Sequence, residues 1–219
     1  DLPSGARLVP LINKVETQAR LKVARESARE LLRGGADEVL LGTTAGAEPV
    51  RERWGRVAVI LLAAGGSTRM AEAGEIKQLL PWGRGTLITR AADVALQSEA
   101  DRVVVVVGCQ ADRVEAALEG RELTVVHNLA WAAGQSGSVR AGLDALDPGV
   151  TGAIFLLVDQ PAVGTELLNA VIRMYRESGA AVVAPRAGGR RANPVLFDRA
   201  LWPEIHQVRG DMGGRALLD

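Results

Sequence analysis

The sequence VAVILLAAGGSTRMAEAGEIKQLLPW, residues 57–82, decides the fold of this chain. Its first six residues are all apolar, which predicts a strand that is buried on both faces. The strand continues into a loop of small residues, and small side chains let backbone N–H groups approach an anion closely. Arg69 and Lys77 follow within a few positions and add positive charge. The stretch therefore predicts a loop that binds phosphate groups, and a triphosphate suits it best.

This loop belongs to neither of the two commonest types of phosphate loop. No Lys-Ser or Lys-Thr closes it, so it does not fit G-x-x-x-x-G-K-[ST], and the chain contains no G-x-G-x-x-G. The alternative interpretation is an ordinary turn between a strand and a helix, with a solvated arginine and lysine.

From residue 57 onward the sequence alternates between strands and helices. Continuous Val/Ile/Leu strands in such a series predict an α/β fold with a Rossmann-like, mostly parallel sheet and helices on both faces. Ligands bind beyond the carboxyl ends of the strands in these sheets, and every motif described here falls at such an end. The predicted elements are strands at 57–62, 102–107, 123–126 and 153–158, and helices at 86–97, 111–118, 135–146 and 165–178, the last with Gly179 as its stop.

Two further motifs carry carboxylates. Leu157-Val158-Asp159-Gln160-Pro161 follows the third buried strand, where one carboxylate can hold Mg²⁺ against a triphosphate while water and phosphate fill the other positions. A helix N-cap is the alternative role for a lone aspartate at this place. Gly210-Asp211-Met212-Gly213-Gly214-Arg215 lies near the end of the chain, and its residues alone indicate only a flexible turn.

Composition excludes several classes of function. The 219 residues carry 26 basic and 26 acidic side chains, so charge gives no reason to expect nucleic acid or an anionic membrane as a partner. The single cysteine, Cys109, excludes an intrachain disulfide, fits a reducing cytoplasm and is expected to be a buried packing residue. No apolar run is long enough to span a bilayer, and we expect no targeting segment. His127 and His206 have no partner at metal-ligand spacing, so we expect surface or packing roles for them.

The phosphate-loop segment resembles the signature of the molybdenum-cofactor nucleotidylyltransferases, which have the nucleotide-diphospho-sugar-transferase type of fold. The family pattern is L-A-[AG]-G-x-S-x-R-M-G-x-x-K-x-L-L-P. Here the residues Ala71, Glu72 and Ala73 form an insertion before Gly74, which leaves the reach of Lys77 open. The resemblance implies that the nucleotide is bound by Leu62, Ala63, Ala64, Gly65, Gly66, Ser67, Arg69, Lys77, Gly108, Asn128, Ser136 and Ser138.

The resemblance extends to the later motifs. It implies that Asp159 binds the metal in the family's D-x-P, that Asp211 in G-D-x-G-x-R is a second carboxylate, and that Arg69, Lys77 and Asp159 are catalytic. Residues 134–140 resemble G-x-x-S-S-x-R, where Ser136 and Ser138 either contact the nucleotide or cap a helix. Residues 190–197 resemble R-x-G-x-P-V-x-F, with Ala192 where a glycine is usual. The residues expected to bind the acceptor are Gln160, Pro161, Asn193 and Pro194.

The implied reaction is transfer of CMP from CTP to a molybdopterin-type cofactor, with Mg²⁺ as metal and pyrophosphate as product, in the maturation of molybdenum hydroxylases. Ala64 favours CTP, because L-A-A-G marks the cytidylyl branch of the family and L-A-G-G the guanylyl branch. Two alternatives stay open: a nucleotidylyltransferase that acts on a sugar phosphate or polyol phosphate, and a non-catalytic carrier of a nucleotide cofactor for a hydroxylase.

Residues 1–52 form a different unit, for which the sequence predicts a strand at 7–12, a helix at 17–33 and a strand at 38–42, a small βαβ segment. Asn13-Lys14-Val15-Glu16 looks like the N-K-x-D guanine reader of P-loop GTPases, but no phosphate loop completes it here, so we expect no hydrolysis. Residues 2–16 resemble the carboxyl-terminal part of an accessory protein for selenium-dependent molybdenum hydroxylases. We therefore expect a partial accessory module at 1–52 and a nucleotidylyltransferase domain at 53–219, both parts of a longer protein, with the second truncated at its carboxyl end.

Overall fold

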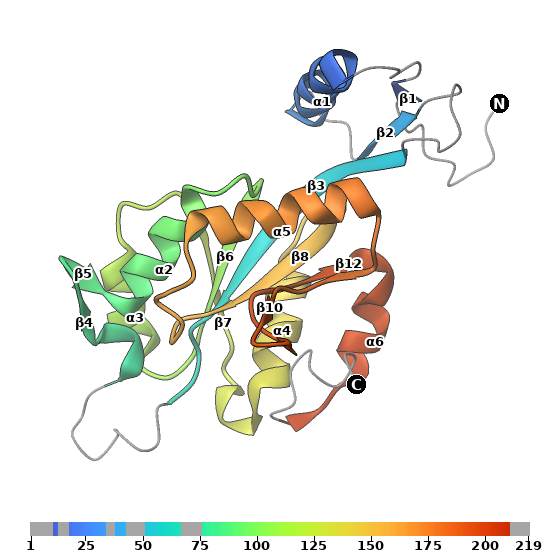
Figure 1. Ribbon diagram of the computed structural model, residues 1–219. Coiled ribbons are helices and arrows are strands. Elements are labelled where there is room, and N and C mark those ends of the chain that lie inside the picture. The colour runs from blue at the N-terminus through green and yellow to red at the C-terminus, as the bar shows by residue number, and fades with distance from the viewer. Residues whose placement is uncertain (1–10, 13–17, 34–37, 43–50, 67–75, 211–219) are drawn as a thin grey trace.

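The computed structural model describes residues 11–12, 18–33, 38–42, 51–66 and 76–210. Figure 1 shows a central sheet between helices, and a smaller unit of α1, β1 and β2 that projects from one end of it. The elements are β1 (Leu11–Ile12), α1 (Gln18–Arg33), β2 (Glu38–Gly42), β3 (Arg51–Leu62), η2 (Lys77–Leu79), β4 (Pro81–Trp82), β5 (Gly85–Thr86), α2 (Leu87–Leu96), β6 (Arg102–Val107), α3 (Ala111–Leu118), β7 (Thr124–His127), η3 (Trp131–Ala133), α4 (Gln135–Asp144), β8 (Val150–Leu157), α5 (Thr165–Ser178), β9 (Val182–Val183), β10 (Arg186–Ala187), β11 (Arg190–Arg191), β12 (Val195–Asp198), η4 (Arg199–Leu201) and α6 (Trp202–Gln207).

The strand β3 is the centre of the main sheet. It pairs in parallel with β6 on one side and with β8 on the other, and β7 continues the parallel series beyond β6. β12 is antiparallel to both β8 and β9. The predicted α/β class with a mostly parallel sheet is therefore confirmed; antiparallel pairing occurs beyond β8, where β12 and β9 lie, and between β2 and the start of β3.

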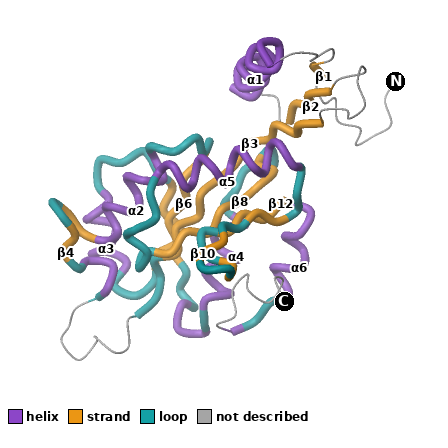
Figure 2. Tube along the Cα trace, viewed as in Figure 1, coloured by secondary structure: helices purple, strands orange, loops and turns teal. Residues whose placement is uncertain are grey.

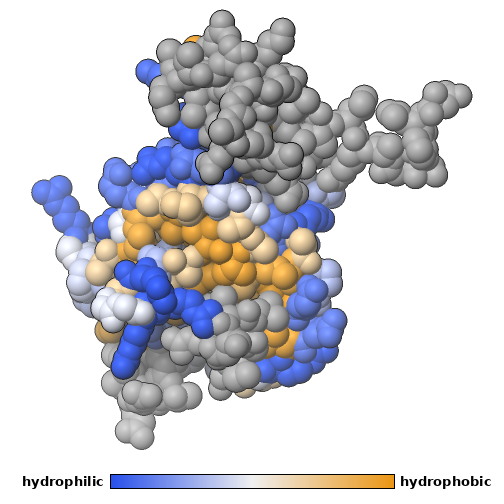
Figure 3. Space-filling model, turned by 45° about the vertical axis from the view of Figure 1, so that its right-hand side comes forward, coloured by the Kyte–Doolittle hydropathy of each residue, from blue (hydrophilic) through white to orange (hydrophobic). Residues whose placement is uncertain are grey.

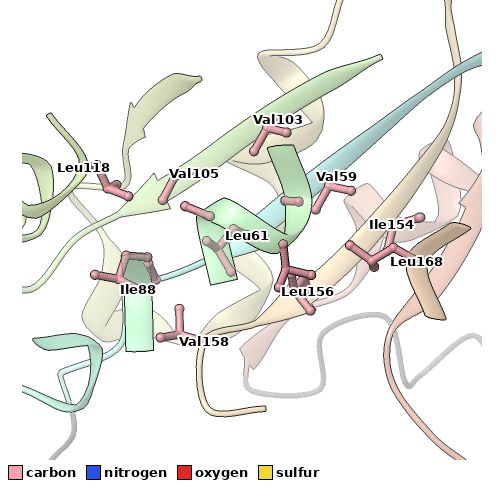
Figure 4. Packing of buried hydrophobic residues seen from close by; sticks show 14 of the residues in the cluster. Val59, Leu61, Ile88, Val103, Val105, Leu118, Ile154, Leu156, Val158 and Leu168 are labelled. Atoms are coloured by element: carbon pink, nitrogen blue, oxygen red, sulfur yellow. The ribbon is translucent and has the colours of Figure 1, made fainter. Parts of the chain in front are cut away.

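The core consists of two layers, one on each face of this sheet. Alternate residues of β3 face opposite sides, as the period-two geometry of a strand requires: Val59 and Leu61 belong to one layer, and Ala58 and Ile60 to the other. Figure 4 shows the first layer, where β3, β6 and β8 meet Ile88 of α2 and other helical side chains. Fully burying an aliphatic side chain of this kind stabilises a fold by about 1.5–3 kcal/mol.

Most predicted elements lie close to the observed ones, and Figure 2 shows the alternation of helix and strand along the chain. The predicted helices at 111–118 and 165–178 have the observed bounds, and Gly179 ends α5 with a left-handed backbone (φ 61°). The predicted strand at 57–62 is wrong at its start, because β3 begins at Arg51. Its first residues pair with β2, and nothing local in the sequence announces that partner.

The projecting unit has the predicted βαβ arrangement. β1 and β2 are parallel with α1 between them, and β2 pairs antiparallel with the first five residues of β3. Buried side chains of α1, β2 and β3 form a small core of their own. The predicted boundary between residues 52 and 53 lies inside β3, so the unit and the body share one strand, and the division into two domains stays a prediction.

Charged contacts hold α1 against the body. Arg25 pairs with Glu177 at the end of α5 (2.9 Å), and Arg29 pairs with Glu99 (3.2 Å). Two guanidinium groups lie over the ring of Trp54, those of Arg29 (5.3 Å to the ring centroid) and Arg176 (4.7 Å). Such cation–π contacts add to the packing where they are shielded from water. The unit is therefore fastened at the amino-terminal edge of the main sheet.

One face of the body shows hydrophobic residues gathered in a patch that hydrophilic residues border (Figure 3). Met174 of α5 is among the large apolar side chains exposed to solvent. None of the described helices is long and apolar enough to cross a membrane.

An ion pair fastens the last described helix, α6, to α4. His206 contacts Asp144 through Nε2 (2.8 Å) and the backbone oxygen of Trp202 through Nδ1 (2.7 Å). Both partners are acceptors, so the ring binds them best when both nitrogens carry a proton. The hydrogen bond to Asp144, followed by the one to Trp202, raises the pKa of His206 above its ordinary value.

The pair of His206 and Asp144 predicts that the free energy of unfolding falls slightly as the pH rises above neutral. Because folding raises the pKa of His206, its contribution is fully present below the pKa of the unfolded chain and is lost as the pH rises through the folded value. We expect urea unfolding of the wild type to show a fall of less than about 1 kcal/mol between pH about 6 and about 9 that His206→Gln lacks, since the pair is partly exposed. Asp144→Asn should remove the same fall, and equal pH profiles for all three proteins would contradict the assignment.

Candidate active site

The candidate site lies at the carboxyl edge of the sheet, where three strands end together. Leu62, the last residue of β3, is level with Val106 of β6 and Leu157 of β8. The segment after β3 is tied to β6 and the residues that follow it, because Ala63 N–H donates to Val106 O (2.9 Å) and Cys109 N–H donates to Ala64 O (3.0 Å). The predicted nucleotide-binding residues 62–66 therefore lie together at this edge, with Gly65 exposed.

Gln78 holds the backbone of this loop from η2. Its side chain is only 3% exposed, and its Nε2 donates to the carbonyl oxygens of Ala63 and Gly65, both at 2.7 Å. A trans peptide points its N–H opposite to its C=O, so the N–H of Gly66 points away from Gln78. Gln78 is not among the residues predicted from the sequence. Its position directly after Lys77, in a short stretch of apolar residues, is the signal that could have found it.

The structure brings Lys77 and Asp159 together although they lie on different segments. Lys77 Nζ donates to Asp159 Oδ2 at 2.8 Å, and the side chains are 40% and 44% exposed. The three-residue insertion before Gly74 has therefore not carried Lys77 away from the edge of the sheet. Asp159 is not a helix cap, because α5 begins after Gly164, five residues later, and has no side-chain cap. The N-cap alternative is excluded.

On the β7 side, Asn128 joins the end of the sheet to α4. Its backbone N–H donates to Val107 O (2.8 Å), its Nδ2 donates to Ser138 Oγ (3.0 Å), and its Oδ1 accepts from Ala130 N–H (3.1 Å). Ser136 and Ser138 are both buried in α4. The N-cap of α4 is Gly134, with no side-chain hydrogen bond, so neither serine caps this helix.

Trp131 also lies at this site, although it is not among the residues predicted from the sequence. A Cβ atom built on Gly66 would lie 2.7 Å from Trp131 Cζ3, and one built on Gly108 would lie 2.6 Å from Trp131 Cβ. Real Cβ atoms do not approach so closely, so both positions require glycine, and the side chain of Trp131 extends from Gly108 to Gly66. Neither glycine has a positive φ, so the requirement comes from the contact with Trp131 and not from the backbone conformation. An aromatic residue between Asn128 and the serine motif was the available signal.

The predicted acceptor residues reach the same edge from two directions. Gln160 and Pro161 directly follow Asp159, and the side-chain oxygen Oε1 of Gln160 is buried with no hydrogen-bond partner in the part of the chain described. β12 runs antiparallel to β8, and Val195 is level with Phe155, so residues 193–194 lie beside the end of β8. Ala192 does not have a positive φ, so the residue that replaces the family glycine adopts an ordinary backbone.

Three predicted residues, Ser67, Arg69 and Asp211, lie outside the described residues. Among those described, no group of three or more His, Cys, Asp or Glu side chains could hold a metal ion. Asp159 is partly exposed at the site, and a single carboxylate that works with substrate phosphates and water is the usual arrangement for Mg²⁺. The donor set therefore fits a cation that is shared with a nucleotide.

Within the described structure, Cys109 has a packing role and His127 lies at the surface. Cys109 is half-buried, packs against the first core layer and lies close to Gly66, where a built Cβ atom would be 3.6 Å from its Sγ. His127 is exposed and contacts Glu115 of α3 through Nε2 (3.0 Å).

Comparison with known proteins agrees with this geometry. Residues 59–219 match the family model described as the MobA-like NTP transferase domain. Nicotine blue oxidoreductase of Paenarthrobacter nicotinovorans is 31% identical over 166 residues, which cover 73% of this chain and 79% of that protein. Molybdenum cofactor cytidylyltransferase of Escherichia coli (strain K12) is 30% identical over 142 residues, which cover 64% of this chain and 69% of that protein.

Solved structures with the same fold include Rv0371c of Mycobacterium tuberculosis H37Rv, with a TM-score of 0.66 and 29% identity over 74% of this chain and 82% of that one. A second structure of that protein is a complex with manganese, with a TM-score of 0.61 and 28% identity over 74% of this chain and 81% of that one.

Proposed function

We propose that this chain, which belongs to the MobA-like NTP transferase family, transfers CMP from CTP to a molybdopterin-type cofactor and releases pyrophosphate. The observation that carries the proposal is the pair of Lys77 and Asp159 beside a glycine loop at the carboxyl edge of the sheet. A relative named molybdenum cofactor cytidylyltransferase, 30% identical, supports the choice of substrate. With one cysteine in the chain, we propose the cytoplasm as its compartment.

The residues of this site position and neutralise phosphate groups. An oxygen of the acceptor phosphate attacks the α-phosphorus of CTP, the bond between the α- and β-phosphates breaks, and pyrophosphate leaves. Lys77 donates to the phosphates as a compact positive charge, backbone N–H groups of the glycine loop donate beside it, and we assign Arg69 to the same task. Asp159, with Asp211, would hold Mg²⁺, which supplies charge stabilisation when bound. The manganese complex of Rv0371c supports a divalent cation in this family.

We assign the acceptor to the side of the site formed by the end of β8 and the start of β12. Gln160 and Pro161 come from the first, and Asn193 and Pro194 from the second.

We propose that residues 1–52 belong to an accessory module that serves a molybdenum hydroxylase, as their sequence suggests. The contacts of α1 with the body support a fixed attachment. The hydroxylase that would receive the product is a proposed partner.

Base choice gives a prediction for this function. We expect a preference for CTP over GTP of at least about tenfold in kcat/KM, because Ala64 adds a methyl group where the guanylyl branch has glycine and this packing leaves less room for a purine, and Ala64→Gly should reduce that preference. Ala58→Gly is the matched control, since Ala58 is buried in the same core layer but lies six residues before Ala64, away from the carboxyl edge of the sheet. A preference for GTP or ATP in the unmutated protein would overturn the cytidylyltransferase assignment and leave nucleotidyl transfer standing.

A pyrophosphate-release assay with all four nucleoside triphosphates, Mg²⁺ and molybdopterin tests the proposal directly. Release with CTP and molybdopterin is the expected result. Release only with a sugar phosphate or polyol phosphate would move the chain to the wider transferase class. Binding of the dinucleotide product without any release would indicate a carrier. The assay also separates this chain from oxidoreductase chemistry, for which one relative is named, because that chemistry forms no pyrophosphate.

A further inference from the structure

We infer that Trp131 forms a wall of the nucleotide-base pocket, and that Ala64 influences base choice through this indole rather than by touching the base. The inference rests on the proposed function, because it concerns how that site selects a nucleotide. It makes Trp131 a specificity-determining residue.

Ala64 is too buried to act directly. Its side chain is 3% exposed and belongs to the core layer on the α4 face of the sheet, together with Ile60 and Val106. A Cβ atom built on Gly108 would lie 2.9 Å from Ala64 Cβ and 2.6 Å from Trp131 Cβ. The methyl group of Ala64 and the side chain of Trp131 therefore pack around the same glycine. Because the methyl group is buried, a base in the site would meet the side chains packed beside it and not the methyl group itself.

Trp131 is held in one place by small residues. Its six-membered ring lies against Gly66 and its Cβ and Cγ atoms lie against Gly108. The ring also packs against the core layer that contains Ala64. The two glycine contacts leave no room for a larger side chain. A larger side chain at position 66 or 108 must therefore move the indole, because packed interiors have little free space, and the methyl group of Ala64 fills part of the same layer beside Gly108.

The free part of the indole is suited to a base. Trp131 is partly buried, and its ring N–H makes no hydrogen bond to any described residue and is not buried. The ring lies against Gly66, at the start of the predicted phosphate loop, so a nucleotide whose phosphates occupied that loop would place its base within reach. Bases stack readily on aromatic side chains, and removal of such a ring lowers affinity by roughly tenfold or more.

Quenching of tryptophan fluorescence tests the contact in the intact chain. We expect CTP with Mg²⁺ to quench emission of the wild type and of Trp82→Phe, and not that of Trp131→Phe. Trp82 is the matched control, since it is 48% exposed on the β4–β5 hairpin. Equal quenching in Trp131→Phe and in the wild type would overturn the inference.

A double-mutant cycle tests the route from Ala64 to the base. In equilibrium binding of CTP and GTP, we expect Ala64→Gly and Trp131→Leu each to reduce the CTP preference several-fold, and the double variant to show no further reduction. Reductions that multiply in the double variant, or equal losses for both nucleotides in Trp131→Leu, would overturn the inference. Thermal unfolding of each variant checks that the fold persists, and Trp131→Phe, which keeps an aromatic ring, should restore much of the preference.

The two proposals fail in different ways. If CTP and molybdopterin give pyrophosphate but the Trp131 variants keep the base preference, only the role of Trp131 falls. If nucleotides quench Trp131 but no pyrophosphate forms, the cytidylyltransferase proposal falls and the pocket assignment stands. A wild type that binds none of the four nucleotides would overturn both.

Discussion

Asp159→Asn is expected to lower turnover with CTP and Mg²⁺ by about a hundredfold or more while the fold stays intact. The carboxylate stands at the end of β8, partly exposed and beside the glycine loop, where it would share a divalent cation with the triphosphate. An asparagine keeps the shape and loses the charge that holds the cation. Loss of that charge stabilisation is worth several kcal/mol, and each 1.4 kcal/mol is about tenfold in rate.

Steady-state pyrophosphate release with titrated Mg²⁺ or Mn²⁺ measures this effect. Asp147→Asn is the matched control, because Asp147 is also an exposed partner of a cation, Arg102, but lies before β8, at the opposite edge of the sheet. Circular dichroism of both variants checks the fold. A rate near that of the wild type in Asp159→Asn would remove the metal assignment.

Lys77→Ala is expected to weaken both nucleotide binding and rate, by roughly ten- to a hundredfold in kcat/KM. Hydrogen bonds to charged groups contribute about 1.5–3 kcal/mol, and an ammonium group near phosphates acts as a compact charge. The 2.8 Å contact with Asp159 holds this ammonium group at the site before any nucleotide arrives. Removing it also leaves the Asp159 carboxylate without this cation.

Nucleotide titration by calorimetry, together with kcat and KM, measures both parts of that loss. Lys22→Ala is the control, since Lys22 is an exposed lysine on α1 in the projecting unit. A titration curve of Lys77→Ala that superimposes on that of the parent would mean that Arg69 supplies the charge instead.

Much of the body could be predicted from local sequence. The run 102–107 contains five consecutive valines, and a continuous run of β-branched apolar residues strongly favours a buried strand. The helix at 165–178 was marked by apolar residues at helical spacing and by Gly179. β12 was not predicted as a strand, because Val195–Asp198 is short and becomes one only through pairing with β8.

Part of the candidate site could likewise be predicted from local sequence, and part of it could not. The glycine loop and Asp159 each come directly after a predicted parallel strand, so the predicted sheet already placed both at its carboxyl edge. Gln78 and Trp131 were missed because their roles depend on contacts with segments 13–65 residues away: Gln78 with Ala63 and Gly65, and Trp131 with Gly66 and Gly108. A side chain that supports another segment leaves no local periodicity to read.

The length of β3 sets the distance between the projecting unit and the candidate active site. Its first residues pair with β2 in the projecting unit, and its last residue leads into the glycine loop. Twelve residues at about 3.3 Å each make a rod of roughly 40 Å. A protein that bound only to the projecting unit would stand about a domain's width from Lys77 and Asp159. Such a protein could remain bound while substrate enters the site and product leaves it. To receive the product directly, it would need a segment of its own that extends to the site.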